Sequence, residues 1–257
     1  MKKLFYVIVF VMILICGLVL FWLPGKYTVP IIMYHHVAKI DKAEPNWVSP
    51  ENFEYQMAFL KKHGFRVISL DQLADAIKSK RRVSRKSVVL TFDDGYEDNY
   101  THAYPILKKY GFTATIFLIS GAVDQEKFLT TKQALQMHTD HISFGSHTRT
   151  HVYLPSESRE RQADEIVNSK KILEKKLGFS MASFSYPNGG FSEDIKSIVK
   201  LAGYKEACVT NRGYNRLNKD VYELHRVRFS DQDIRQDYLW AKLSGYYNLF
   251  RKSKSPY

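Results

Sequence analysis

Strand-like and helix-like segments alternate regularly along most of this chain. Runs rich in apolar and β-branched residues occur at residues 29–34, 65–70, 87–92, 112–119, 142–145, 182–186, 204–209 and 224–229. Helical patterns lie between many of them, at residues 49–63, 71–77, 100–110, 157–177 and 193–201. This alternation favours parallel strands joined by crossover helices, and seven or eight such units predict an α/β fold closed into a barrel.

Capping signals predict where several of these helices begin and end. Ser49 and Pro50 are expected to begin the first helix and Gly64 to stop it. Asp71 is expected to cap the second helix, and Gly178 is expected to end the longest one.

The strand expected at 87–92 ends abruptly on Asp93, Asp94 and Gly95. Adjacent residues on an extended segment point to opposite sides. Two neighbouring carboxylates can therefore serve one site only if the chain bends there, and Gly95 permits that bend. One carboxylate could hold a metal while the other stays free as a base, although the same three residues are also ordinary in a solvated turn.

Two histidines, His147 and His151, follow another short apolar run. On one helical turn this four-residue spacing would place both imidazoles on the same face. Histidine together with carboxylate is a normal ligand set for zinc. The histidine pair and the Asp-Asp-Gly motif together therefore predict a metal site at the strand ends, where barrels of this kind collect their functional groups.

These motifs resemble those of the polysaccharide deacetylases of the NodB-homology type, carbohydrate esterase family 4. The resemblance is carried by Thr91-Phe92-Asp93-Asp94-Gly95 and His147-Thr148-Arg149-Thr150-His151, with further agreement at Ser185-Tyr186-Pro187-Asn188-Gly189. It extends over roughly residues 29–230. It implies a distorted (β/α)7 or (β/α)8 barrel and the metal-dependent removal of acetyl groups from a polysaccharide.

The resemblance also implies roles for the motif residues. Asp93, the first acid, would be the general base. Asp94, His147 and His151 would hold a divalent metal, with Zn²⁺ as the first choice and Co²⁺, Ni²⁺ or Fe²⁺ as alternatives.

The third motif and a late arginine are expected to support this chemistry. A backbone N–H in the turn of Tyr186, Pro187 and Asn188 would stabilise the oxyanion, and the Tyr186 ring is a candidate for stacking on a sugar. Arg226 could orient Asp93 through a bidentate contact, and an ordinary structural pairing is the alternative.

The general acid is less clearly marked, because the sequence departs here from the commonest family pattern. Many members supply the acid from a late Leu-x-x-His motif, whereas Leu224 and His225 are adjacent in this chain. The third motif reads Ser185-Tyr186-Pro187 in place of Arg-Pro-Pro, and residues 211–215 stand where Asp-x-x-Asp-Trp is common.

The segment Met33-Tyr34-His35-His36 instead resembles exopolysaccharide deacetylases that act on poly-β-1,6-N-acetylglucosamine. In those enzymes a Tyr-His pair at the first strand brings the acid. We therefore expect His35 to be the general acid, with His225 and His36 as alternatives. The alternative interpretation of His35 is a hydrogen-bonded histidine of the core with a structural role.

The N-terminus carries an apolar run without charge, residues 4–23, directly after Met1-Lys2-Lys3. Such a run can cross a hydrocarbon core of about 30 Å as one helix, and the two lysines favour an N-terminus held in the cytoplasm. A cleaved signal peptide is the alternative, but its apolar region is usually shorter and ends in small residues. Here the end is Phe21-Trp22-Leu23-Pro24, so we expect a single-pass anchor with the catalytic domain outside the cell.

The remaining chain is long enough for one sizeable domain. We expect a cytoplasmic tip at 1–3, an anchor at 4–23, a linker at 24–28, a deacetylase domain at 29–250 and a basic tail at 251–257. The net charge of +12 could suggest a nucleic-acid partner. We expect none, because the basic residues are dispersed and the domain would be extracellular; anionic lipid headgroups or wall polymers are the simpler targets.

The sequence therefore predicts a membrane-anchored, metal-dependent N-deacetylase whose substrate is an acetylated polysaccharide. Poly-β-1,6-N-acetylglucosamine is the preferred substrate, and glucosamine units and acetate would be the products. Peptidoglycan deacetylation, O-acetyl xylan esterase activity and a catalytically inactive sugar-binding module are the alternatives. A binding module would have no use for a spare base beside a metal ligand set, which favours an enzyme.

Overall fold

The computed structural model describes residues 2–39, 45–213, 215–252 and 254–257 of the chain. Met1 in the expected cytoplasmic tip, residues 40–44, Tyr214 in the segment 211–215 and Ser253 in the tail lie outside these residues.

Eight parallel strands follow one another around a nearly closed barrel, in the spatial order β10-β9-β8-β7-β6-β5-β1-β11. They are β1 (Ile31–Tyr34), β5 (Ser87–Phe92), β6 (Thr115–Leu118), β7 (Ser143–Ser146), β8 (Ser183–Ser185), β9 (Glu206–Val209), β10 (Leu224–His225) and β11 (Val227–Arg228). A further strand, β4 (Arg66–Val67), pairs with β5, while β2 (His36–Val37) and β3 (Trp47–Val48) pair with each other. The predicted α/β barrel is confirmed.

The barrel closes at Arg226. Strand β10 pairs with β9 and strand β11 pairs with β1, and Arg226 alone separates β10 from β11. One continuous segment therefore pairs first with one edge of the sheet and then with the opposite edge. The single strand expected at 224–229 is two short strands. The Arg226 side chain is fully buried at this switch.

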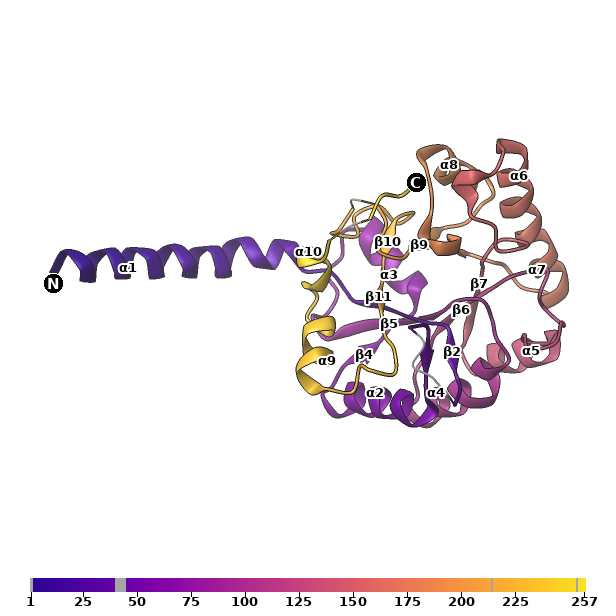
Figure 1. Cartoon of the computed structure of the whole chain (residues 1–257), viewed down its shortest axis with the longest axis horizontal. Helices are drawn as coiled ribbons and strands as arrows, with labels where there is room; N and C mark the ends of the chain where they lie inside the picture. Colours follow the sequence, from indigo (N-terminus) through magenta and orange to yellow (C-terminus); the bar gives the residue numbers. More distant parts are fainter. Residues whose placement is uncertain (1, 40–44, 214, 253) are drawn as a thin grey trace.

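Helices cover the outside of the strands (Figure 1). They are α2 (Pro50–Lys62), α3 (Leu70–Lys78), α4 (Tyr104–Tyr110), α5 (Thr131–Thr139), α6 (Arg159–Ala163), α7 (Ser169–Leu177), α8 (Glu193–Leu201), α9 (Gln236–Leu243) and α10 (Tyr247–Phe250). Shorter helical turns are η3 (Asn99–Ala103), η4 (Leu154–Ser156), η5 (Asp164–Asn168) and η6 (Pro187–Gly189).

Most of the predicted helix boundaries agree with the structure. The Ser49 hydroxyl caps α2, and Gly178 ends α7 in the left-handed conformation. The prediction that Asp71 caps α3 was wrong, because Ser69 is the cap and shares a reciprocal capping box with Gln72. The helix expected at 157–177 is interrupted by the π-helical turn η5.

The N-terminal helix stands away from the barrel (Figure 1). It comprises α1 (Lys2–Gly17), η1 (Leu18–Trp22) and η2 (Leu23–Lys26), and its apolar span is not buried against the rest of the protein. Its length and composition are sufficient to cross a membrane, and a signal sequence has the same features.

Candidate active site

A cavity of about 470 Å³ opens at the C-terminal ends of the barrel strands. Its wall includes His35 after β1, Asp93 and Asp94 after β5, His147 after β7 and Asn188 after β8. The loops that follow parallel barrel strands converge at one end. Residues far apart in the sequence therefore meet in one cavity.

The bend predicted between the two acids is present. Asp94 and Gly95 both have positive φ angles, 73° and 74°. A side chain at position 95 would place its Cβ 2.5 Å from Leu118 Cδ2, so any other residue would adopt a strained backbone conformation and would also displace the Leu118 side chain. The bend leaves Asp93 buried beside Arg226 and turns Asp94 towards the two histidines.

Asp94, His147 and His151 form a cluster that fits a metal ion. Asp94 Oδ1 lies 3.5 Å from His147 Nε2 and 3.4 Å from His151 Nε2. This oxygen is buried and accepts no hydrogen bond from the described residues. An unsatisfied carboxylate oxygen facing two ring nitrogens has the donor set and the need for a divalent cation.

A backbone contact fixes the His147 ring. Its Nδ1 lies 2.7 Å from the carbonyl oxygen of Ser185. Because a carbonyl only accepts, Nδ1 carries the hydrogen and the lone pair of Nε2 faces Asp94, as a metal ligand requires.

The two histidines lie on a loop, and the helical turn predicted for them was wrong. Thr148 and His151 have φ angles of 65° and 60°, which are incompatible with a helix. The Thr148 hydroxyl accepts a hydrogen bond from the His151 amide at 3.0 Å. This tight loop, rather than helical periodicity, brings the imidazoles together.

Glu165 holds that loop in place. Its fully buried carboxylate accepts hydrogen bonds from the Arg149 and Thr150 amides, each at 2.8 Å, and from the Thr150 hydroxyl at 2.7 Å. Arg161 pairs with it at 2.8 Å. Sequence reasoning missed Glu165, for which the only signal was an acid within a helix that must bury one face.

The orienting contact expected between Arg226 and Asp93 is present. Two Arg226 nitrogens donate to the two carboxylate oxygens, each at 2.7 Å. The guanidinium also donates to the Thr91 and Ser185 hydroxyls and to the Val209 carbonyl. Burial by itself would raise the pKa of Asp93, but the charge and hydrogen bonds of Arg226, together with the His147 ring, hold it well below its usual range.

Of the adjacent histidines His35 and His36, His35 faces Asp93. Its Nε2 lies 4.0 Å from Asp93 Oδ2, and its Nδ1 is buried without a partner among the described residues. Asn99 holds the His35 carbonyl at 2.8 Å. Burial lowers the pKa of His35 below 6.5, although the charges of Asp93 and Asp94 oppose this effect.

The other two acid candidates have different surroundings. His36 Nδ1 lies 2.6 Å from Asp98, and its ring stacks between Trp47 and Tyr96 with centroids 4.0 and 3.6 Å away. This stack lines a smaller adjoining cavity of about 310 Å³. His225 is buried, lies 3.4 Å from Glu223 and does not line the catalytic cavity.

The third motif contributes through Asn188 rather than through Tyr186. The Tyr186 ring is fully buried and its hydroxyl donates to the Tyr222 carbonyl at 3.1 Å, so it cannot stack on a sugar. The amides of Tyr186 and Gly189 donate to other carbonyls, and Pro187 has no N–H. Within this described turn, the Asn188 N–H is the amide left for the cavity that Asn188 lines.

Four cationic residues that the motifs did not reveal line the mouth of the cavity: Arg212, Arg228, Arg251 and Lys254. Arg212 donates to carbonyl oxygens and Arg228 to the Asn46 side chain. Arg212 also donates to the Tyr257 main-chain oxygen at 3.4 Å. Across the described ranges, no Asp or Glu side chain forms an ion pair with any of the four. Burial lowers the pKa of Arg251; Tyr247 opposes this effect, and the nearby charge of Arg228 adds to it.

The C-terminal tail supplies two of these cations because it packs beside the β9–β10 connection. The Lys254 amide donates to the Asn211 carbonyl at 3.1 Å, and the Gly213 amide donates to the Lys254 carbonyl at 3.0 Å. The Phe191 amide donates to Pro256 at 3.0 Å. The segment expected to be a plain basic tail thus forms part of the cavity wall.

Comparisons with known proteins agree with this site. The polysaccharide deacetylase family model matches residues 80–207. YxkH of Bacillus subtilis (strain 168), provisionally named a polysaccharide deacetylase, is 34% identical over 207 residues, which cover 80% of this chain and 72% of the relative. The poly-β-1,6-N-acetyl-D-glucosamine N-deacetylase of Staphylococcus aureus (strain MRSA252) is 30% identical over 198 residues, 72% of this chain and 68% of that protein.

A solved structure is also similar over most of the domain. The Streptococcus pyogenes deacetylase PplD, in complex with acetate, superposes with a TM-score of 0.74 at 32% identity. The match covers 79% of this chain and 93% of PplD.

Proposed function

This chain belongs to the polysaccharide deacetylase family, hydrolases that act on the amide bonds of acetylated sugars, and we propose that it is a metal-dependent N-deacetylase of N-acetylglucosamine units. One observation carries the proposal. The Asp94, His147 and His151 cluster lies beside the Asp93–Arg226 pair at the mouth of the barrel.

Asp94 Oδ1, His147 Nε2 and His151 Nε2 would hold the metal. When bound, a divalent ion supplies a Lewis acid that polarises the amide carbonyl and lowers the pKa of water. Zn²⁺ is the ion we propose first, because two imidazoles and a carboxylate are common zinc ligands; Co²⁺, Ni²⁺ and Fe²⁺ suit the same set.

Asp93 would act as the general base. Its lowered pKa keeps the carboxylate ionised throughout the neutral range, and Arg226 holds both oxygens in one orientation. Each carboxylate oxygen has two lone pairs, so each can accept a proton from water while it remains bonded to Arg226.

His35 would donate the proton that the departing amine needs. The reaction breaks the bond between the acetyl carbon and the sugar nitrogen, adds water's oxygen to the acetyl carbon and leaves a proton on nitrogen. Two observations support this role: His35 lines both adjoining cavities, and its Nε2 lies 4.0 Å from Asp93 Oδ2. The Asn188 N–H would stabilise the developing oxyanion.

We propose poly-β-1,6-N-acetylglucosamine as the first substrate to test. The support is the Tyr34-His35 pair at the end of β1 and the S. aureus relative, which carries this polymer in its name. The His36, Trp47 and Tyr96 stack beside the catalytic cavity offers an aromatic wall for a neighbouring sugar.

Peptidoglycan deacetylation is the second candidate, and the cationic mouth favours it. The peptide stems of peptidoglycan carry carboxylates, whereas a β-1,6-linked N-acetylglucosamine polymer is neutral. Arg212, Arg228, Arg251 and Lys254 would attract such carboxylates.

We further propose that the N-terminal helix remains as a membrane anchor and that the catalytic domain lies outside the cell. Lys2 and Lys3 precede the apolar run of this helix, and that run is not buried against the domain. The run ends on large residues rather than at a small-residue cleavage site.

The test is acetate release by the full chain in detergent, stripped of metal and reloaded with Zn²⁺. Neutral β-1,6-linked N-acetylglucosamine oligomers and peptidoglycan are assayed side by side. We expect metal-dependent release from the oligomers, and Asp93→Asn should abolish release while oligomer binding persists. Release from peptidoglycan alone would make peptidoglycan the preferred substrate. If folded, metal-loaded protein released acetate from neither polymer, the proposed deacetylase activity would be refuted.

A further inference from the structure

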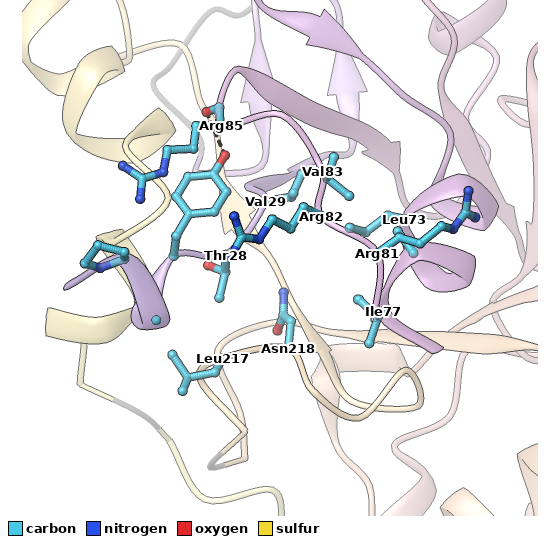
Figure 2. Close-up of a pocket in the computed structure, with 14 residues that line it drawn as sticks. Thr28, Val29, Leu73, Ile77, Arg81, Arg82, Val83, Arg85, Leu217 and Asn218 are labelled. Carbon is cyan, nitrogen blue, oxygen red and sulfur yellow. Dashed lines mark hydrogen bonds between the residues drawn. The ribbon is translucent and has the colours of Figure 1, made fainter. Parts of the chain in front are cut away.

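A second cavity, of about 600 Å³, lies at the other end of the barrel from the catalytic cavity. Its lining residues precede strands instead of following them: Val29 comes before β1, Val83 and Arg85 before β5, and Asn218 before β10. Because the strands are parallel, these residues mark the N-terminal end of the barrel. Figure 2 shows them around one open space beside α3.

The end of the N-terminal helix forms part of the wall of this cavity. Pro24 and Gly25 line it, and the chain then continues through Tyr27 and Thr28. The Tyr27 hydroxyl donates to the Arg85 carbonyl at 2.7 Å. The Thr28 amide donates to the Gly245 carbonyl at 2.9 Å, so the segment leaving the helix is attached to both sides of the barrel base.

The charged side chains that line this cavity are all positive. Arg81, Arg82 and Arg85 line it, and none of its 14 lining residues is acidic. Arg81 donates to the Ser79 hydroxyl at 2.9 Å, and the Arg85 guanidinium lies 5.9 Å from the centre of the Tyr27 ring. In the part of the chain that the structure describes, no carboxylate pairs with any of the three. Apolar side chains complete the wall: Val29, Leu73, Ile77 and Val83.

The apolar run fixes the level of this cavity relative to a bilayer. Residues 4–23 rise about 1.5 Å each and so match a hydrocarbon core of about 30 Å. In the proposed anchor, Pro24 and Gly25 follow directly and would therefore lie among the lipid headgroups. Lys26 Nζ, 5.1 Å from the Trp22 ring, adds the aromatic and basic pairing typical of that level.

We propose that this cavity binds the phosphate of an anionic phospholipid, such as phosphatidylglycerol, in the membrane leaflet from which the domain emerges. The inference rests on the proposed membrane anchor. Guanidinium groups match phosphate oxygens in a bidentate geometry. The apolar wall formed by Val29, Leu73, Ile77 and Val83 can receive the glycerol and the first methylene groups of the lipid.

Binding at this end of the barrel would set the orientation of the enzyme. The cavity at the strand N-termini would face the membrane, and the catalytic cavity at the strand C-termini would face away from it. The enzyme would therefore act on polymer beyond the membrane surface.

Hydrogen exchange of the full chain in lipid nanodiscs tests the proposal. Discs of phosphatidylcholine alone are compared with discs of phosphatidylcholine mixed equally with phosphatidylglycerol. We expect exchange in residues 79–86 to slow several-fold with phosphatidylglycerol, and the effect to disappear when Arg81→Gln, Arg82→Gln and Arg85→Gln are combined. The matched control combines Lys132→Gln, Lys171→Gln and Lys175→Gln, which remove equal charge on α5 and α7 and should preserve the effect.

Each other outcome contradicts a defined part of the proposal. Equal exchange in both discs, or slowing that survives in the arginine variant, would overturn the lipid site. Equal protection by inorganic phosphate in detergent would show that the site binds a free anion instead of a lipid.

Failure of the chain to insert into either disc would refute the anchor and this site with it. Acetate release in detergent tests the proposed function separately and should be unchanged in the arginine variant. Should the triple variant not fold, each single Arg→Gln variant should show a partial loss of protection.

Discussion

At the scale of single residues, Arg226 both closes the barrel and controls the protonation state of Asp93, the proposed base. It is the residue between β10 and β11, and its guanidinium holds both oxygens of buried Asp93. The pair stabilises the folded state above the unfolded pKa of a carboxyl, about 3.9. Its contribution is lost as pH falls through the lower pKa of folded Asp93.

Arg226→Gln should shift the acid limb of the pH–rate profile upward. Without the guanidinium, burial raises the pKa of Asp93 and the carboxylate is protonated at a higher pH. Removal of one partner of a buried pair should also lower the free energy of unfolding by about 3–5 kcal/mol. Arg226→Lys should restore the acid limb in part, because it returns the charge without the bidentate contact.

The measurements are kcat/KM for acetate release against pH and denaturant unfolding of each variant. A purely structural role for Arg226 would lower stability and leave the acid limb of the folded fraction unchanged. That result would contradict the proposed control of Asp93.

At the scale of elements, the turn η5 supports the loop that carries the metal ligands. Glu165 lies on η5 and accepts hydrogen bonds from Arg149 and Thr150, between the two histidines. Glu165→Gln keeps an acceptor oxygen but removes the charge. We expect zinc affinity to fall about 10–100-fold, the range typical when a group that orients metal ligands is altered.

Competition with a chelator measures this affinity directly, without the catalytic assay. Glu160→Gln is the matched control, because Glu160 lies on the adjoining helix α6 with an exposed side chain. Unchanged zinc affinity in Glu165→Gln would show that the loop holds its shape without the carboxylate.

The same elements explain which parts of the site the sequence could predict. Asp93, Asp94, His147 and His151 lie in short motifs directly after strands, so their spacing and the barrel pattern were sufficient to group them. Glu165 accepts hydrogen bonds from the loop of the histidine pair and reaches that loop only through folding. Local spacing therefore indicated a helix where tertiary contacts impose a tight loop.

At the scale of the whole molecule, the barrel has a basic cavity at each end. One adjoins the N-terminal helix, and the other is the catalytic cavity, whose mouth carries Arg212, Arg228, Arg251 and Lys254. The C-terminal tail brings Arg251 and Lys254 to this mouth from the far end of the sequence. The dispersed basic residues of the sequence did not predict this cluster of cations, because the cluster depends on hydrogen bonds between the tail and residues 191, 211 and 213.

This arrangement predicts a substrate-dependent effect of tail charge. Arg251→Gln and Lys254→Gln should each raise KM for peptidoglycan by up to about fivefold, the value of one exposed charge pair of roughly 1 kcal/mol. KM for neutral β-1,6-linked oligomers should not change. Lys252→Gln is the control, since Lys252 is exposed and lines neither cavity.

Salt provides the second measurement for the same prediction. At about 0.1 M salt, charges more than about 10 Å apart are largely screened. The difference between wild type and the two tail variants on peptidoglycan should therefore narrow as salt rises. Equal effects on both substrates, or the same effect in Lys252→Gln, would mean that the tail cations support the fold of the mouth rather than attract an acidic polymer.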